Sequence, residues 1–118
     1  WCGSAAELSR LIASIDGLPH VKDILSQKSI QFMTTEQPDH QYSIGWNYTP
    51  KSNRPWIRTG SLAGTSAIVL KYPDGQCWIL ITNTSTWKGH GFSNDTVAFF
   101  EKLRKQFMAD MPKKDLFI

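Results

Sequence analysis

The sequence has few cysteines, and it lacks both long apolar runs and clusters of basic residues. Its apolar stretches, such as residues 67–70 and 78–81, are far shorter than the roughly 20 residues that a membrane-spanning helix needs, so no membrane span is predicted. Cys2 and Cys77 are too far apart for a Cys-x-x-Cys zinc or redox motif. Cys77 lies in an apolar run and is predicted to be a buried thiol, while a disulfide with Cys2 stays open.

Charge and histidine spacing exclude two further classes of partner. The formal net charge is +3, but the basic residues are spread over the second half of the chain and no nucleic-acid motif accompanies them. We therefore predict no nucleic-acid partner. His20, His40 and His90 do not have the spacing of metal ligands, so we predict no metal and no cofactor.

The composition that is present is typical of one folded domain. The chain has 118 residues, of which 41% are hydrophobic and 19% charged, which is enough to build one core. It opens on Trp1-Cys2-Gly3-Ser4, without an initiator methionine or a charged leader segment. We expect residues 1–118 to form a single α+β domain that is a fragment of a longer chain.

Three helices are predicted from capping residues and apolar spacing. Ser4 and Glu7 fit a capping box, and the apolar residues that follow at helical spacing end near residues 16–19. Ser26 is predicted to cap a short helix that ends near residues 34–35. Ser93 is predicted to cap a long C-terminal helix, whose apolar stripe contains Val97, Phe100, Leu103 and Phe107.

Four segments have the composition of β-strands, at residues 42–48, 56–61, 65–72 and 76–83. The Pro-Asp-Gly sequence at residues 73–75 predicts an antiparallel hairpin between the last two. Both faces of this hairpin are apolar, so we expect helices to cover the sheet on at least one side. The predicted fold is an antiparallel sheet of three to four strands flanked by N-terminal helices and a long C-terminal helix.

A candidate binding segment lies on the strand at residues 56–61. Arg58 supplies a permanent positive charge, Thr59 and Ser61 supply hydrogen-bond donors, and Gly60 lets another backbone approach closely. Such a series suits an anionic ligand or an oxyanion. The alternative from composition alone is an edge strand that leads into a glycine-rich turn.

An ordered series of motifs in the chain resembles the C-terminal part of the serine β-lactamase-like family, which includes penicillin-binding proteins, class C β-lactamases, D-Ala-D-Ala peptidases and related esterases. The resemblance covers residues 1 to about 107. It rests on the helix start at residues 3–8, Tyr-Ser-Ile-Gly-Trp at 42–46, Trp-Ile-Arg-Thr-Gly-Ser-Leu-Ala-Gly-Thr-Ser at 56–66, Tyr-Pro-Asp-Gly at 72–75, and the strand ending in Asn83.

The resemblance implies a role for each residue of the Arg-Thr-Gly-Ser segment. Arg58 stands where the family has Lys or His and would bind a substrate carboxylate, with Thr59 bonding the same carboxylate. Gly60 would let the substrate approach the strand, and the backbone N–H of Ser61 would donate to the oxyanion. An arginine is a poor proton shuttle, which puts ordinary β-lactam hydrolysis in doubt.

The family's nucleophile is missing from its expected place. Its Ser-x-x-Lys and Tyr-x-Asn motifs precede the Thr-Gly strand, whereas the chain has Ser-Thr-Trp-Lys only at residues 85–88, and it has no Tyr-x-Asn. The resemblance thus implies a fragment that is inactive alone and whose partners are the N-terminal part of the same protein and a small-molecule or peptide substrate. It also implies a bacterial periplasm or cell envelope location.

Two other interpretations remain open. The first is a non-catalytic module that binds peptide or glycan through the Arg58 strand and Trp56, since Trp56 and Trp87 are predicted to line a groove while Trp46 and Trp78 pack in the sheet. The second is a purely structural half-domain that pairs with an N-terminal half.

Overall fold

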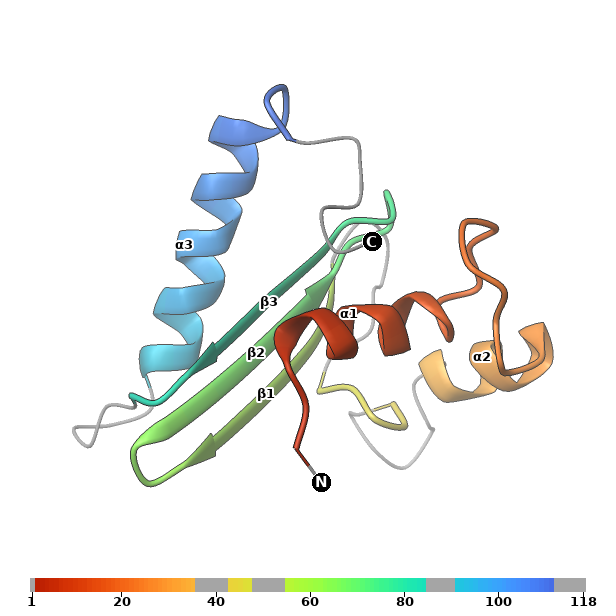
Figure 1. The fold of residues 1–118 in the computed structure, drawn as a ribbon, viewed down its shortest axis with the longest axis horizontal. Coiled ribbons are helices and arrows are strands. Elements are labelled where there is room, and N and C mark those ends of the chain that lie inside the picture. Colours follow the sequence, from red (N-terminus) through yellow and green to blue (C-terminus); the bar gives the residue numbers. More distant parts are fainter. Residues whose placement is uncertain (1, 36–42, 48–54, 85–90, 112–118) are drawn as a thin grey trace.

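The computed structural model describes residues 2–35, 43–47, 55–84 and 91–111. Three helices and one antiparallel sheet form an α+β fold, as predicted (Figure 1). In chain order the elements are α1 (Ala5–Ala13), α2 (Gln27–Thr34), β1 (Trp56–Leu62), β2 (Thr65–Lys71), β3 (Cys77–Thr82) and α3 (Gly91–Phe107).

The first two helices begin at the capping residues that the sequence predicts. The Ser4 hydroxyl accepts from the Glu7 N–H at 3.2 Å, and the Glu7 carboxylate accepts from the Ser4 N–H at 2.7 Å. These hydrogen bonds, the one from the Ser4 backbone first, hold the pKa of Glu7 below its usual value. Ser26 caps α2 in the same way, accepting from the Ser29 N–H at 3.1 Å.

The sheet has the order β1-β2-β3, so β2 is its central strand. Gly60 pairs with Ala67 and Arg58 with Val69 between β1 and β2, while Val69 pairs with Ile79 of β3. Because side chains alternate along a strand, these residues all lie on one face of the sheet. In Figure 1, α1 lies in front of the sheet and α3 on its other side.

Each face of β2 contributes to its own apolar core. Ile68, Leu70 and Tyr72 are buried with Phe100 of α3, and Trp78 packs on Phe100 with ring centroids 5.5 Å apart. On the opposite face, the buried residues are Ile12, Trp46 and Val69. The predicted division of the hairpin into two apolar faces is therefore confirmed, and so is the packing of Trp46 and Trp78.

The strand predicted at residues 42–48 is wrong over the residues that the structure describes. Residues 43–47 form a turn with a single bridge between Ser43 and Trp46. Gly45 has φ +85°, a left-handed conformation that reverses the chain and that other residues adopt at a cost. The aromatic composition of this segment reflects burial of Trp46 in a core rather than strand pairing.

The N-cap predicted at Ser93 is also wrong, because α3 already begins at Gly91. Ser93 lies within the first turn of the helix. The Thr96 hydroxyl donates to the Phe92 carbonyl at 2.8 Å, which stabilises the turn that precedes the predicted start. Of the predicted apolar stripe, Phe100 is buried and Val97 and Leu103 pack against the core, whereas Phe107 is exposed.

No helix among the described residues is both long enough and apolar enough to cross a membrane.

Candidate functional site

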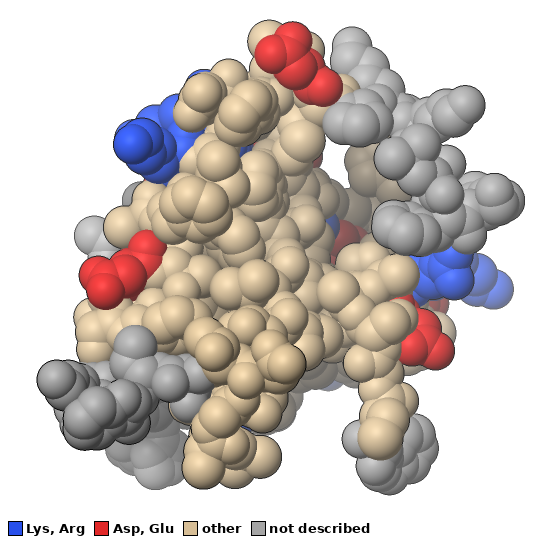
Figure 2. Space-filling model, turned by 60° about the vertical axis from the view of Figure 1, so that its left-hand side comes forward, with Lys and Arg blue, Asp and Glu red and all other residues tan. Residues whose placement is uncertain are grey.

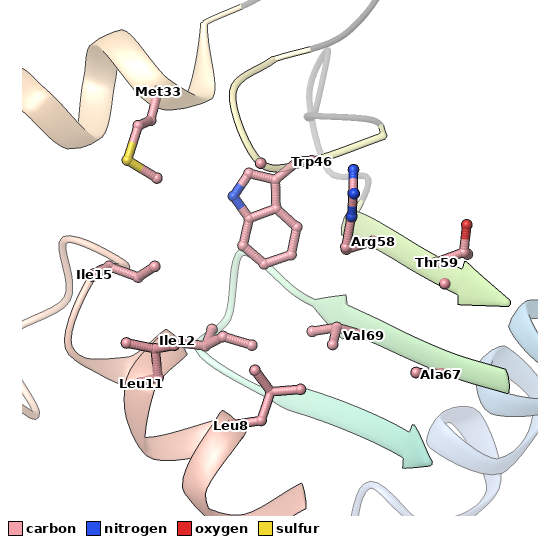
Figure 3. Close-up of a pocket in the computed structure, with 12 residues that line it drawn as sticks. Leu8, Leu11, Ile12, Ile15, Met33, Trp46, Arg58, Thr59, Ala67 and Val69 are labelled. Carbon is pink, nitrogen blue, oxygen red and sulfur yellow. The ribbon is translucent and has the colours of Figure 1, made fainter. Parts of the chain in front are cut away.

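A pocket of about 340 Å³ lies on the α1 face of the sheet, against the edge strand β1 (Figure 3). Residues from α1, α2, the turn at 43–47, β1 and β2 line it. The lining is mainly apolar and consists of Leu8, Leu11, Ile12, Ile15, Met33, Gly45, Trp46, Arg58, Thr59, Gly60, Ala67 and Val69. Figure 3 shows Leu8, Ile12 and Trp46 facing Val69 across the space.

The structure brings three of the four predicted site residues to this pocket. Arg58 and Gly60 pair with Val69 and Ala67, so they lie on the face that α1 covers. Thr59 also contributes to the lining. Ser61 pairs with Ser66 on the α3 face and does not line the pocket, and its hydroxyl donates to the Thr65 carbonyl at 3.5 Å.

The outer edge of β1 shows where the Ser61 N–H points. The Asn47 N–H donates to the Ile57 carbonyl at 2.8 Å, and the Thr59 N–H donates to the Asn47 Oδ1 at 2.9 Å. Backbone groups of alternate residues point to the same edge of an antiparallel strand. The Ser61 N–H therefore points away from β2, to the same edge as the Thr59 N–H.

Asn47 is the site residue that sequence reasoning missed. It bonds to β1 on both sides of Arg58, and the Thr59 hydroxyl lies 3.5 Å from the same Asn47 oxygen. Both donors of Thr59 are therefore engaged by Asn47. The only signal in the sequence was a polar residue directly after Trp46, which also fits a glycosylation sequon and so does not indicate edge capping.

Trp46 and Trp56 form the aromatic part of the site. Trp46 is 5% exposed and packs against Trp56 with ring centroids 5.3 Å apart and planes at 62°. Trp46 lines the pocket, while Trp56 supports it from behind and is absent from the lining. The prediction that Trp56 lines a groove is therefore not confirmed at this pocket, where its ring packs on Trp46. Trp87 lies outside the described residues.

Arg58 is the only cation that lines the pocket, and its side chain is exposed. The ion pairs described in the structure join Lys71 to Asp16 and Arg104 to Asp74. Among the described residues, no carboxylate forms an ion pair with Arg58. A guanidinium keeps its charge at all physiological pH values and binds carboxylates through paired hydrogen bonds. The pocket thus combines apolar walls with one solvent-exposed guanidinium group.

Among the described residues of the lining, none presents a candidate nucleophile to the pocket, because the Thr59 hydroxyl lies on the α3 face of β1. Cys77 lies on the same face of the sheet, but burial raises the pKa of its thiol to about 11, so it stays protonated at neutral pH. The Ser-Thr-Trp-Lys sequence at 85–88 lies outside the described residues, as do His40 and His90. Over residues 2–35, 43–47, 55–84 and 91–111, no group of three or more His, Cys, Asp or Glu side chains is placed to hold a metal ion.

Comparisons with family models, with curated proteins and with solved structures found no match to this chain.

Proposed function

We propose that these residues form the C-terminal part of a serine hydrolase of the β-lactamase and penicillin-binding type, with residues 58–61 as one wall of its active site. The observation that supports this most strongly is the placement of three groups on one edge strand. Arg58 and Gly60 lie at the same pocket, and the N–H of Ser61 points to the outer edge of the strand. An acyl-transfer site needs such a combination: a cation for the substrate, room for its backbone and a donor for the oxyanion.

In the proposed reaction, a serine hydroxyl attacks the carbonyl carbon of an amide or ester, and the carbonyl electrons move to oxygen. The Ser61 N–H donates to that oxyanion, a contribution of roughly 3–4 kcal/mol where one such donor has been removed from an enzyme. The leaving group departs with a proton, and water then hydrolyses the acyl-enzyme. Arg58 orients the substrate through its carboxylate and takes no part in proton transfer.

Gly60 is suited to its proposed role because it leaves space beside the strand. A Cβ atom built at residue 60 meets no other atom within 4 Å. A substrate can therefore approach the backbone of β1 at this point without a side chain in its path.

The nucleophile and its base would come from the N-terminal part of the same protein, because the family's Ser-x-x-Lys precedes the Thr-Gly strand. Within residues 2–35, 43–47, 55–84 and 91–111, no strand pairs with the outer edge of β3, which supports such a partner. Alternation along β3 directs the backbone groups of residues 77, 79 and 81 away from β2, and Ile81 is 45% exposed. Figure 2, which turns the α3 side of the molecule forward, shows a central area of uncharged residues bordered by charged side chains. An exposed strand edge is suited to further pairing.

A fluorescent penicillin tests the proposal. We expect no covalent label on the 118-residue chain, and a label on the product of the complete reading frame that contains it. Replacing the serine of the upstream Ser-x-x-Lys should abolish the label. In that longer protein, Arg58→Ala should slow labelling by at least about tenfold, the loss of one charged hydrogen bond, and Lys102→Ala, an exposed lysine of α3, serves as the matched control. Labelling of the 118-residue chain would contradict the claim that it lacks the nucleophile. Absence of label on the complete product would contradict the proposal that the protein is a serine hydrolase.

The second candidate function is a non-catalytic binding module. The apolar pocket, with an exposed Arg58 and no nucleophile presented by its described lining residues, favours it. Reversible binding of a carboxylate ligand by a complete product that never becomes labelled would assign the chain to this class. A bacterial envelope location belongs to the hydrolase proposal, since the substrates of that family are cell-wall components.

A further inference from the structure

We propose that the pocket beside β1 binds an apolar monocarboxylate, with its carboxylate on Arg58 and its hydrocarbon chain between α1 and the sheet. The inference rests on the proposed function for the position of the anion at Arg58. It adds the chemical class of the rest of the ligand, which is a medium-length acyl chain or a comparable apolar group. The Arg-Thr-Gly-Ser segment and the pairing of β1 do not specify this part of the ligand.

The chemistry of the lining carries this assignment. Leu8 and Ile12 of α1 face the sheet residue Val69 across the pocket (Figure 3), and Leu11 and Ala67 also contribute to the lining. Ile15, Met33 and Trp46 close the remaining sides. Arg58 carries the one charge of the lining, and Trp46 adds an indole N–H. Thr59 pairs with Ile68, so its hydroxyl lies on the α3 face, where Asn47 accepts from it. A ligand here meets one charge, one indole N–H and otherwise apolar side chains.

This lining disfavours a sugar or a polar peptide. Each hydroxyl or amide placed between α1 and Val69 would lose its hydrogen bonds to water without finding a partner, which is costly. A methylene group gains from the same surroundings, by about fourfold in affinity when fully buried. The volume of about 340 Å³ lies at the small end of the range for small-molecule sites, so a short chain fits and a polymer does not.

The depth of the pocket depends on two small residues that pair across β1 and β2. Gly60 and Ala67 lie opposite each other on the face that α1 covers. Because a Cβ atom at residue 60 would meet nothing within 4 Å, a larger side chain at this position extends into the open space. Gly60 is not among the glycines with positive φ, so the backbone of β1 accepts such a side chain.

Octanoate, propionate and 1-octanol are the probes, titrated into the 118-residue chain and followed by calorimetry and by amide shifts in NMR spectra. Octanoate should bind at least about tenfold more tightly than propionate, because of its additional methylenes. It should also bind at least about fivefold more tightly than 1-octanol, which lacks the charge. Gly60→Leu should weaken octanoate binding at least about tenfold by filling the pocket. Thr65→Leu places the same leucine side chain at an exposed position outside the lining and should leave octanoate binding unchanged.

The outcomes separate this inference from the proposed function. Equal affinities for octanoate and propionate, or normal octanoate binding by Gly60→Leu, overturn the apolar half of the site even if Arg58→Gln still reduces both affinities. Octanoate binding that Arg58→Gln leaves unchanged overturns the anion site on which the proposed function depends. If thermal unfolding shows that Gly60→Leu is not folded, Ala67→Leu fills the same space from β2 and takes its place.

Discussion

The ammonium group of Lys71 lies 2.5 Å from Asp16 Oδ2, and both side chains are almost completely excluded from solvent. Lys71 also donates to the Gly75 carbonyl at 2.8 Å, and Asp16 Oδ1 accepts from the Leu18 N–H at 2.9 Å. This ion pair joins the segment after α1 to the hairpin between β2 and β3. It holds the helix that forms one wall of the pocket against the sheet that forms the other.

Removing one partner of this pair should destabilise the protein strongly. Asp16→Asn leaves the Lys71 charge buried without its counter-ion, so we expect the free energy of unfolding to fall by about 3–5 kcal/mol in urea titrations. The double variant Asp16→Leu with Lys71→Met removes both charges and should recover most of that loss. A loss below about 1 kcal/mol for Asp16→Asn would show that the pair behaves like an exposed one.

Asn47→Ala should open the outer edge of β1. The substitution removes the side-chain oxygen that accepts from the Thr59 N–H, while the backbone bond from residue 47 to Ile57 is retained. We expect hydrogen exchange at the Thr59 amide to accelerate by at least about tenfold, since one protecting hydrogen bond is lost. The Val69 amide on the central strand is the internal control and should keep its rate. Unchanged exchange at Thr59 would contradict the role assigned to Asn47.

Tyr72→Phe should loosen the attachment of α3 to the sheet. The Tyr72 hydroxyl donates to Glu101 at 3.0 Å, and the Arg104 guanidinium lies 4.2 Å from the centre of the Tyr72 ring. Burial, assisted by Glu101, raises the pKa of Tyr72, so the phenol stays protonated and donates. We expect a loss of about 1–2 kcal/mol in the free energy of unfolding. Glu101→Gln keeps an acceptor and should lose less; equal losses would contradict a bond from the phenol.

Cys77 should make stability depend on alkaline pH. Burial raises the pKa of its thiol to about 11, whereas an unfolded cysteine titrates near 8.5. The folded state therefore holds the proton more tightly, so the stabilisation is complete below about pH 8.5 and is lost as the pH rises toward 11. The free energy of unfolding should fall between pH 8.5 and 10, and Cys77→Ala should flatten that fall. An equal slope in the variant would assign the pH dependence to other groups.

The raised pKa of Cys77 also predicts that the two cysteines react at different rates with thiol reagents. At pH 8, iodoacetamide should modify the exposed Cys2 and leave Cys77 almost untouched, because only about one thiol in a thousand is ionised three units below its pKa. Mass spectrometry of the labelled peptides measures the ratio. Equal labelling of the two residues would show that Cys77 is accessible.

Local signals predicted most of the fold. The Ser4 and Ser26 caps, the turn at residues 73–75 and the alternation along β2 each depend on residues close together in the sequence, and the structure confirms them. The strand predicted at 42–48 failed because aromatic residues mark burial as well as strands. Gly45 reverses the chain there with a positive φ, and Trp46 packs with Ile12 and Val69, which are far away in the sequence.

The candidate site was predictable only along β1. Arg58, Thr59 and Gly60 stand next to one another in the sequence, so their common location follows from the strand. The apolar walls come from α1, α2 and the turn at 43–47, and no sequence periodicity indicates that Leu8 and Met33 face the same space as Gly60. Asn47 was missed for a related reason, because its bonds to Ile57 and Thr59 form only after the turn at Gly45 brings it alongside β1.

The pairing of Gly60 with Ala67 has a consequence for how ligand selectivity can diverge. Both positions lie on regular strands, so alanine, valine or leucine can occupy either without altering the course of the backbone. Each added methyl group shortens the pocket by a small, graded step while Arg58 keeps its place. In related chains, the sizes of the residues at these two positions would therefore set the longest acyl chain that the pocket accepts.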